Sequence, residues 1–202
     1  FRKKGVFPKK IISASAIGYY GFDTRDIFLR ENSPAGKDYI SDVVVQWENA
    51  VDDFAREMKC EAVKQRIGIV LSKDGGALPS LALPVKLGVG SAIANGNQWL
   101  SWIHWKDLIQ LFYNSSHDGY SGVYNAVATH PVRNNDFVKT LGKILKRPIW
   151  APNVPKFALK LLLGERAQLV AGGNLVSNER LLSNGFQFEF NDLESALIDI
   201  YD

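Results

Sequence analysis

Cysteine and histidine are scarce in this chain of 202 residues, which contains one cysteine, Cys60, and three histidines. A single cysteine excludes an internal disulfide framework and suits a reducing compartment, so we expect a cytoplasmic protein. The histidines, His104, His117 and His130, stand apart from one another and from Cys60, without the spacing typical of metal ligands. We therefore expect no metal site.

The sequence also lacks a long uninterrupted hydrophobic run and a strong net charge. Its longest apolar stretch, residues 76–94, is interrupted by Pro79, Pro84 and Lys86, which argues against a membrane-spanning helix. The formal net charge is +3, and the Lys and Arg residues are dispersed rather than gathered into a basic stripe. We expect neither a membrane nor a nucleic acid as a partner.

Strand and helix patterns alternate along most of the chain. The apolar run Lys10 to Ala16 predicts a buried strand, and residues 62–71 predict a second one. Between them, apolar residues recur at three-and-four spacing over 43–58, which predicts an amphipathic helix with Ser41 as its cap and Trp47 in the core. A strand, a helix and a strand in this order imply a parallel crossover unit.

The pattern changes near residue 150, where strands give way to mostly helical segments. We predict an α/β body over residues 1–150 and a small, mostly helical C-terminal domain over 151–202. The second unit begins with an apolar helix from Pro155 through Leu163. Phe186, Phe188 and Phe190 alternate as in a strand.

Two phosphate-binding motifs are incomplete. Gly88 and Gly90 open a dinucleotide fingerprint, but Ile93 occupies the position of the third glycine. Gly142 and Lys143 lie inside a helix pattern without the leading glycine of a phosphate loop. Neither segment predicts a phosphate cradle.

A hydrolase triad has the right residue types but the wrong context. Ser15, His104 and Asp107 match those types, yet Ser15 lacks a nucleophile elbow and Asp107 suits a helix cap better. We do not expect a hydrolase.

A set of short blocks in fixed order carries the strongest signal. The blocks are Ser13 to Gly21, Gln46 to Glu48, Arg66 to Leu71, Gly75 to Leu78, Gly96 to His104, Tyr124-Asn125, Pro131 to Asn134, Leu163 to Glu165 and Asn184 to Phe186. Together they resemble the C-terminal two-thirds of the epimerase-like family of atypical extended short-chain dehydrogenase/reductases, which are similar to sugar-nucleotide epimerases.

The resemblance implies the C-terminal part of an NAD(P)-binding, Rossmann-like fold. The glycine-rich unit that grips the pyrophosphate precedes the Ser13 block in this family, and no segment of this sequence corresponds to it. We therefore expect a fragment, with NADP or NAD as the cofactor of the full-length protein. An incomplete parallel sheet exposes an edge, so we also expect self-association.

The resemblance further implies a cofactor site at the ends of two strands. Its residues are Ser13, Ala14, Ser15, Ala16, Arg66, Gly68 and Ile69. Arg66 would face phosphate or instead pair with a carboxylate.

The catalytic tyrosine and lysine of the superfamily are missing. Trp47 and Val51 occupy their positions, so ordinary short-chain hydride chemistry is in doubt. The remaining catalytic candidates are Ser15, Tyr20 and Glu48. Each has a structural alternative, namely a strand-end hydrogen bond, a packed tyrosine and an exposed helix glutamate.

Substrate contacts are expected from Trp99, Trp102 and His104, which combine aromatic area with a hydrogen-bonding group. Core packing is the alternative for both tryptophans.

Three functions stay open at this point. They are an NAD(P)-dependent epimerase or oxidoreductase acting on a small molecule such as a nucleotide sugar, a catalytically silent dinucleotide-binding or protein-interaction protein, and an independent interaction module.

Overall fold

The computed structural model describes residues 5, 7–117, 119–153 and 172–202. Its strands are β1 (Lys10–Ala16), β2 (Phe28–Leu29), β3 (Glu61–Ile67), β4 (Ile69–Leu71), β5 (Trp99–Leu100), β6 (Trp102–His104), β7 (Gly122–Ala126), β8 (Val132–Arg133) and β9 (Leu175–Val176). Its helices are the 3-10 turn η2 (Ile17–Tyr20), α1 (Tyr39–Met58), α2 (Leu78–Lys86), α3 (Trp105–Ser115), α4 (Asn134–Ile144), α7 (Glu179–Ser183) and α8 (Leu193–Tyr201). The apolar helix predicted over Pro155–Leu163 and the block Leu163 to Glu165 lie outside the described residues.

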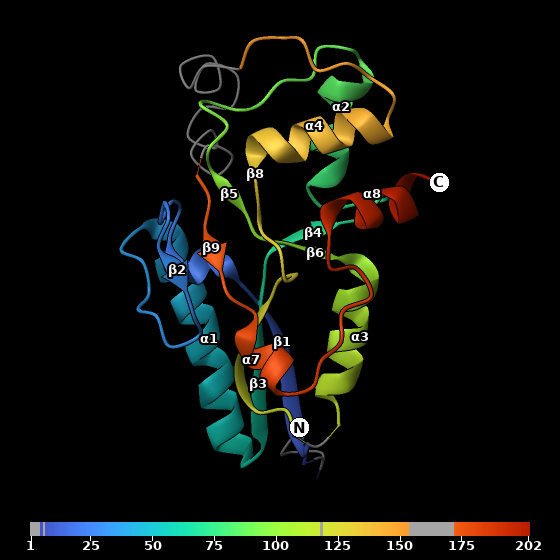
Figure 1. Ribbon diagram of the computed structural model, residues 1–202. Coiled ribbons are helices and arrows are strands. Elements are labelled where there is room, and N and C mark those ends of the chain that lie inside the picture. The colour runs from blue at the N-terminus through green and yellow to red at the C-terminus, as the bar shows by residue number, and fades with distance from the viewer. Residues whose placement is uncertain (1–4, 6, 118, 154–171) are drawn as a thin grey trace.

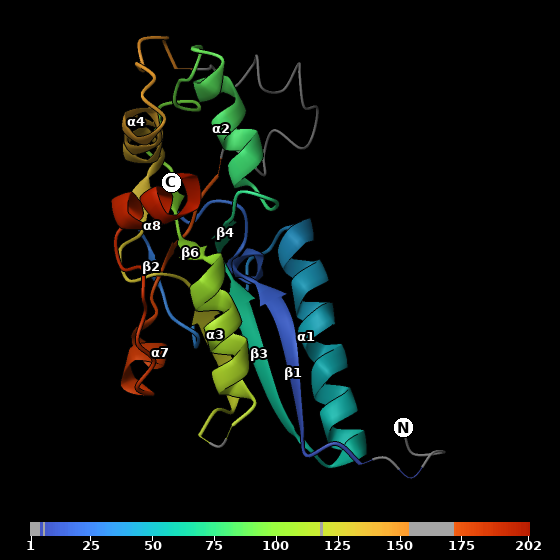
Figure 2. The same cartoon turned by 90° about the vertical axis from the view of Figure 1, so that its right-hand side faces the viewer.

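A parallel three-stranded sheet forms one half of the molecule. Its order is β1-β3-β7, and α1 links β1 to β3, which confirms the predicted crossover unit. Figure 2 shows α1 on one face of the sheet and α3 on the other. The predicted α/β fold class is correct.

The second half of the molecule lies beyond the carboxyl ends of these strands (Figure 1). There α2, α4 and α8 gather around the short pair β4 and β6. Apolar side chains from α2, α4 and α8, among them Ala82, Phe137 and Leu197, belong to one buried cluster. The boundary near residue 150 stays a prediction, although α8 shares this core with α4. The Phe186 to Phe190 segment forms no strand and places its aromatic rings in the cores instead.

Helix α1 turns a different face to the sheet from the one predicted. The buried positions include Val44, Glu48 and Val51, whereas Trp47 is 44 % exposed. The prediction that Trp47 lies in the core is therefore wrong. The sheet presents polar side chains to α1, and these select the face that carries Glu48.

Asp38 is the cap of α1, with Ser41 as its partner. The Asp38 carboxylate accepts a hydrogen bond from the Ser41 backbone N–H at 3.0 Å, and the Ser41 hydroxyl accepts one from the Asp38 N–H at 3.1 Å. Asp38 also accepts a hydrogen bond from the Phe22 N–H at 2.8 Å. The sequence pattern found the helix start but assigned the cap to the wrong member of the pair.

We expect Asp38→Ala to lower the free energy of unfolding by about 1 to 2 kcal/mol, because the change removes both the cap and the bond to Phe22. Urea-induced unfolding of the complete protein measures the loss. Lys37→Ala, at the adjacent exposed position, is the control and should change stability by less than about 0.5 kcal/mol. Equal losses in the two variants would contradict the assignment of Asp38 as the cap.

Candidate active site

Polar residues stand side by side at the carboxyl ends of the three parallel strands. Ser15 of β1 is paired in register with Arg66 of β3, and Arg66 is paired with Asn125 of β7. Residues in register on neighbouring strands project from the same face of a sheet. This face is the one that α1 covers, because Ser15 and Arg66 both contact Glu48.

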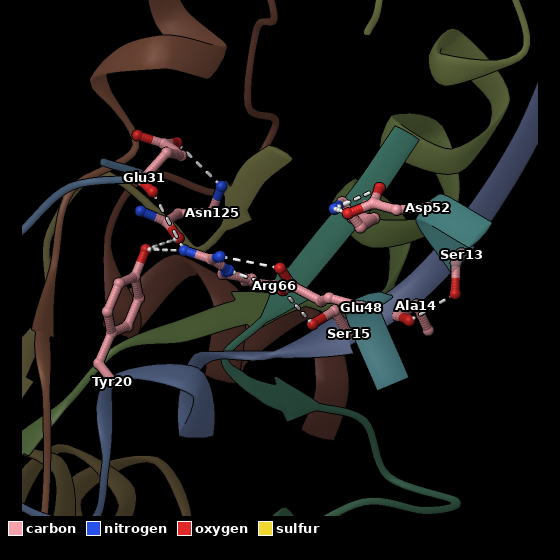
Figure 3. A network of polar contacts seen from close by, with 10 residues as sticks. Ser13, Ala14, Ser15, Tyr20, Glu31, Glu48, Asp52, Arg66 and Asn125 are labelled. Carbon is pink, nitrogen blue, oxygen red and sulfur yellow. Dashed lines mark hydrogen bonds and ion pairs between the residues drawn. The ribbon is translucent and has the colours of Figure 1, made fainter. Parts of the chain in front are cut away.

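Glu48 joins two of these strand-end residues. Its carboxylate accepts hydrogen bonds from Arg66 Nε and from a terminal guanidinium nitrogen at 2.7 and 2.8 Å, and Ser15 Oγ donates to it at 2.7 Å (Figure 3). Only 5 % of Glu48 is exposed. The expectation of an exposed glutamate is therefore wrong, and the structure shows Arg66 paired with a carboxylate.

Tyr20 continues the network on the other side of Arg66. A guanidinium nitrogen of Arg66 donates to the Tyr20 hydroxyl at 3.1 Å, and that hydroxyl donates to Asn125 Oδ1 at 2.7 Å (Figure 3). The same guanidinium nitrogen reaches the Glu31 carbonyl at 3.2 Å. The Tyr19 ring also lies against the guanidinium, with 3.3 Å from its centroid to Arg66 Cζ. The three predicted catalytic residues thus belong to one network, in which Ser15 bonds Glu48, and Arg66 bonds both Glu48 and Tyr20.

The protonation states in this network follow from its hydrogen bonds. Burial opposes ionisation of Glu48, but hydrogen bonds from Arg66 and Ser15 outweigh it and hold the pKa of Glu48 below its ordinary value. Burial likewise opposes protonation of Arg66, yet the bond to Glu48 raises the pKa of that guanidinium. Burial raises the pKa of Tyr20 despite the nearby Arg66 charge. Tyr20 therefore stays protonated near neutral pH, unlike a tyrosine prepared to act as a base.

The network is buried in the described part of the protein. Ser15, Tyr20 and Glu48 are each about 95 % buried or more, and none of them is among the described residues that line the cavity of about 350 Å³ beside the strand ends. The observed contacts match the structural alternatives for Ser15 and Tyr20. Their catalytic roles stay predictions.

A cavity of about 350 Å³ opens next to the network, at the carboxyl ends of β1 and β3. Its apolar wall includes Ile17 after β1, Ile40 of α1 and Ile69 of β4. Ligands of open α/β sheets bind at this edge, outside the carboxyl ends of the strands. Of the predicted site residues, Ile69 and Trp99 line the cavity.

Three polar side chains line the same cavity, namely Ser101, Asn134 and Asn174. Asn174 donates to the Gly21 carbonyl at 2.8 Å, and Ser101 Oγ donates to the Asn174 carbonyl at 2.7 Å. In the sequence analysis, Ser101 and Asn134 belong to two of the resemblance blocks but have no assigned role, and Asn174 is not selected at all. Ser101 and Asn174 are far apart in the chain, so their meeting is not readable from local pattern.

The other predicted cofactor residues have structural roles in the described chain. Ser13 Oγ donates to the Ala14 carbonyl at 2.8 Å, and Ala16 ends β1. Gly68 lies where β3 passes into β4, and a Cβ there would stand 2.3 Å from the Ser101 carbonyl oxygen. This close approach accounts for the glycine without a ligand, and the cofactor assignments stay predictions.

The predicted substrate residues separate in the structure. Trp99 is half-buried, donates from its indole N–H to Asp26 at 2.9 Å and lies 3.7 Å from the Arg133 guanidinium carbon. Trp102 and His104 are fully buried and belong to the interior. Trp102 donates to the His130 carbonyl at 3.0 Å. Trp99 is thus the member of the set placed to meet a ligand.

Ser15, His104 and Asp107, the residue types of a hydrolase triad, each have other partners in the structure. Ser15 is bonded to Glu48, and Asp107 accepts hydrogen bonds from the N–H groups of Glu189 and Phe190 at 2.8 and 3.2 Å. The cap of α3 is His104, whose Nδ1 accepts from the Lys106 N–H at 3.3 Å. The suggestion that Asp107 caps this helix is wrong.

Two further features of the described residues concern membranes and metals. Within residues 5, 7–117, 119–153 and 172–202, no helix combines the length and apolarity needed to cross a membrane. Over the same ranges, no three His, Cys, Asp or Glu side chains are grouped so as to hold a metal ion.

Comparison with known proteins places the chain in a family. A family model described as "Domain of unknown function (DUF1731)" matches residues 154–200. The epimerase family protein SDR39U1 homolog, chloroplastic, of Arabidopsis thaliana is 41 % identical over 191 residues, which cover 94 % of this chain and 54 % of that protein.

Solved structures agree with this relationship. The structure of human epimerase family protein SDR39U1 (isoform 2) with NADPH is 32 % identical, with a TM-score of 0.87 over 96 % of this chain and 65 % of that one. A nucleoside-diphosphate sugar epimerase from Corynebacterium glutamicum is 29 % identical, with a TM-score of 0.78 over 96 % of this chain and 37 % of that one.

The chain spans between about a third and two thirds of the length of these three proteins. Sequence similarity and fold point to the same relatives, and several of the blocks that carried the resemblance, Ser13 to Gly21 and Gly96 to His104 among them, contribute residues to the strand ends and the cavity. The chain therefore belongs to the epimerase family of extended, Rossmann-like short-chain dehydrogenase/reductases.

Proposed function

We propose that this chain is the small-molecule-binding part of an NAD(P)-dependent epimerase or oxidoreductase. The observation that carries the proposal is the cavity at the carboxyl ends of β1 and β3, the edge at which dinucleotide-binding sheets hold their ligands. The structure of human epimerase family protein SDR39U1, which aligns with 96 % of this chain, contains NADPH, and this supports a nicotinamide cofactor. Ile17 and Ile69 then form the part of the cavity nearest the strand ends, facing the nicotinamide.

The Ser15–Glu48–Arg66 network holds this strand edge in place without touching the ligand. Glu48 fixes both Ser15 and Arg66, and Ile17 follows Ser15 by two residues. We expect cofactor affinity to depend on the geometry of the network rather than on a proton transferred by it.

The proposal is tested by titrating the complete protein with NADPH and with NADH in a calorimeter. We expect saturable binding of at least one of them, and Ile69→Trp, which fills the cavity, should weaken that binding by about tenfold or more. Leu83→Trp, at an exposed position of α2 outside the cavity, is the matched control. Failure of both dinucleotides to bind would overturn the proposed function.

A catalytically silent dinucleotide-binding or protein-interaction protein is the second candidate. It is favoured by Trp47 and Val51 at the positions of the missing tyrosine and lysine, and by the lack of any titratable side chain among the described residues that line the cavity. Cofactor oxidation with any added substrate, nucleotide sugars included, would exclude this candidate.

Self-association stays a prediction, and two features support it. β1 is an edge strand of the described sheet, and α1 exposes Tyr39, Val43 and Trp47 on one side. We expect this chain, expressed alone, to show a solution mass above that of a monomer, and Trp47→Glu to reduce it. A monomer at all concentrations would contradict the prediction.

A cytoplasmic location also remains a proposal.

A further inference from the structure

The cavity beside the strand ends carries no charge on its described lining. Its walls are made by apolar side chains such as Ile40, Leu81 and Ile93, together with glycine backbone and the polar side chains already named. No Asp, Glu, Lys, Arg or His is among the described residues that line it. Phosphate groups are held by cationic side chains or by exposed N–H groups at helix ends.

Two arginines near the cavity, Arg66 and Arg133, are already paired with carboxylates. Arg66 is buried and forms a two-point ion pair with Glu48. Arg133 is paired with Asp26 and stacked on Trp99. Neither guanidinium is free to hold the diphosphate of a nucleotide sugar without first breaking an ion pair.

One side chain offers the cavity a directed hydrogen bond. Asn134 is 1 % exposed, and its Oδ1 accepts from the Ile93 backbone N–H at 2.8 Å. This bond identifies the other end of the amide as Nδ2, which makes no hydrogen bond within the described part of the chain. A ligand oxygen in the cavity would give this N–H group a hydrogen-bond partner.

The other two polar side chains have their donors occupied. Both hydrogens of Asn174 Nδ2 reach carbonyls, those of Gly21 at 2.8 Å and Ile17 at 3.4 Å. Ser101 Oγ donates to the Asn174 carbonyl and accepts from the Val176 N–H at 3.1 Å. Among its described lining residues, the cavity therefore presents one available side-chain donor in an otherwise apolar, uncharged setting.

We propose that the substrate bound in this cavity is an uncharged, mostly apolar compound whose carbonyl or hydroxyl oxygen accepts a hydrogen bond from Asn134 Nδ2. The proposal rests on the proposed function and narrows its substrate class. It predicts that UDP-glucose binds more weakly here than a neutral ketone, because a diphosphate would lose water without meeting a cationic side chain among the described lining residues. A volume of about 350 Å³ accommodates a bicyclic ketone.

The test compares two neutral probes of the same shape, 2-acetylnaphthalene and 2-ethylnaphthalene, with UDP-glucose. Binding to the complete protein, loaded with NADPH, is measured by calorimetry at pH 8. We expect saturable binding of the ketone, and Asn134→Asp should weaken it by about tenfold, because the carboxylate keeps the bond to Ile93 but cannot donate. Hydrocarbon binding should weaken less than ketone binding, because the hydrocarbon meets the same new charge but loses no hydrogen bond.

Asn135→Asp is the matched control, since it places the same charge one residue along α4 and outside the cavity. It should leave ketone binding unchanged, and thermal unfolding confirms that both variants fold. Ile93→Glu, which puts a carboxylate into the cavity from another segment, should abolish binding of both naphthalenes, whereas Val89→Glu at an exposed position should not.

Three results would overturn the substrate class. They are absence of ketone binding, ketone binding that is indifferent to Asn134→Asp, and UDP-glucose binding that Asn134→Asp weakens more than Asn135→Asp does. Failure of NADPH to bind, with the ketone results intact in the unloaded protein, would instead remove the proposed function and leave the cavity's preference standing.

Discussion

Replacing Arg66 with methionine lowers the free energy of unfolding by about 3 to 5 kcal/mol, because the change leaves the Glu48 carboxylate buried without its partner. Both side chains are almost fully enclosed, at 4 % and 7 % exposure, so water cannot replace the lost hydrogen bonds. Ser15 alone would remain to satisfy the carboxylate. Urea-induced unfolding of the complete protein at pH 7.5 measures the loss.

A double variant distinguishes the loss of the Glu48–Arg66 ion pair from a simple loss of packing. Arg66→Met combined with Glu48→Leu removes both charges, and we expect it to recover most of the lost stability, to within about 2 kcal/mol of the natural protein. Arg30→Met is the control, because Arg30 and Glu179 form a comparable ion pair in the open, and it should cost less than about 1 kcal/mol. A double variant as unstable as Arg66→Met would show that the charge pair is not the cause.

Acidification from pH 7.5 to 4.5 lowers the unfolding free energy through His104 by about 2 to 3 kcal/mol. Burial of the ring lowers the pKa of His104 to about 4, and Asp199, 3.4 Å from Nε2, only partly opposes this. The unfolded chain takes up a proton near pH 6.5, whereas the folded chain does so near pH 4. The unfolded state therefore binds more protons between these values, and stability falls as the pH drops through this window.

His104→Asn isolates this contribution, because asparagine keeps the cap of α3 and does not titrate. In this variant, the fall in unfolding free energy between pH 7.5 and 4.5 should be smaller than in the natural protein by about 2 to 3 kcal/mol. His117→Gln, on the exposed end of the same region, should retain the full pH dependence. Glu48 contributes little in this window, because its lowered pKa means that its stabilisation is lost below about pH 4.5. Identical slopes for the natural protein and His104→Asn would contradict the assignment.

The parallel sheet and its crossover helix could be predicted from the sequence, because their patterns are local. An apolar run bounded by Pro8 and Gly18 marks β1, and three-and-four spacing marks α1. The face of α1 could not be predicted in the same way. The helix has apolar residues on one side at Trp47 and a mixed side at Glu48, and the polar strand ends on the sheet decided which side is buried.

The residues of the candidate site could be selected from the sequence, but their arrangement could not. Ser15, Tyr20, Glu48 and Arg66 were all selected from the sequence, yet as separate candidates with separate roles. That they form one closed network depends on the register between β1 and β3 and on the rotation of α1, and neither is encoded in a single segment.

The sequence by itself determined the family, the fold class and the absence of the Tyr-x-x-x-Lys pair, since residue order and residue type are enough for these. The tertiary structure decided where the ligand space lies. Ile17, Ile69, Asn134 and Asn174 come from distant parts of the chain and meet at one sheet edge, where they form a cavity whose described lining is uncharged, next to the Glu48–Arg66 ion pair. Only the folded chain shows this, because charge pairing and cavity shape depend on distances between residues far apart in sequence.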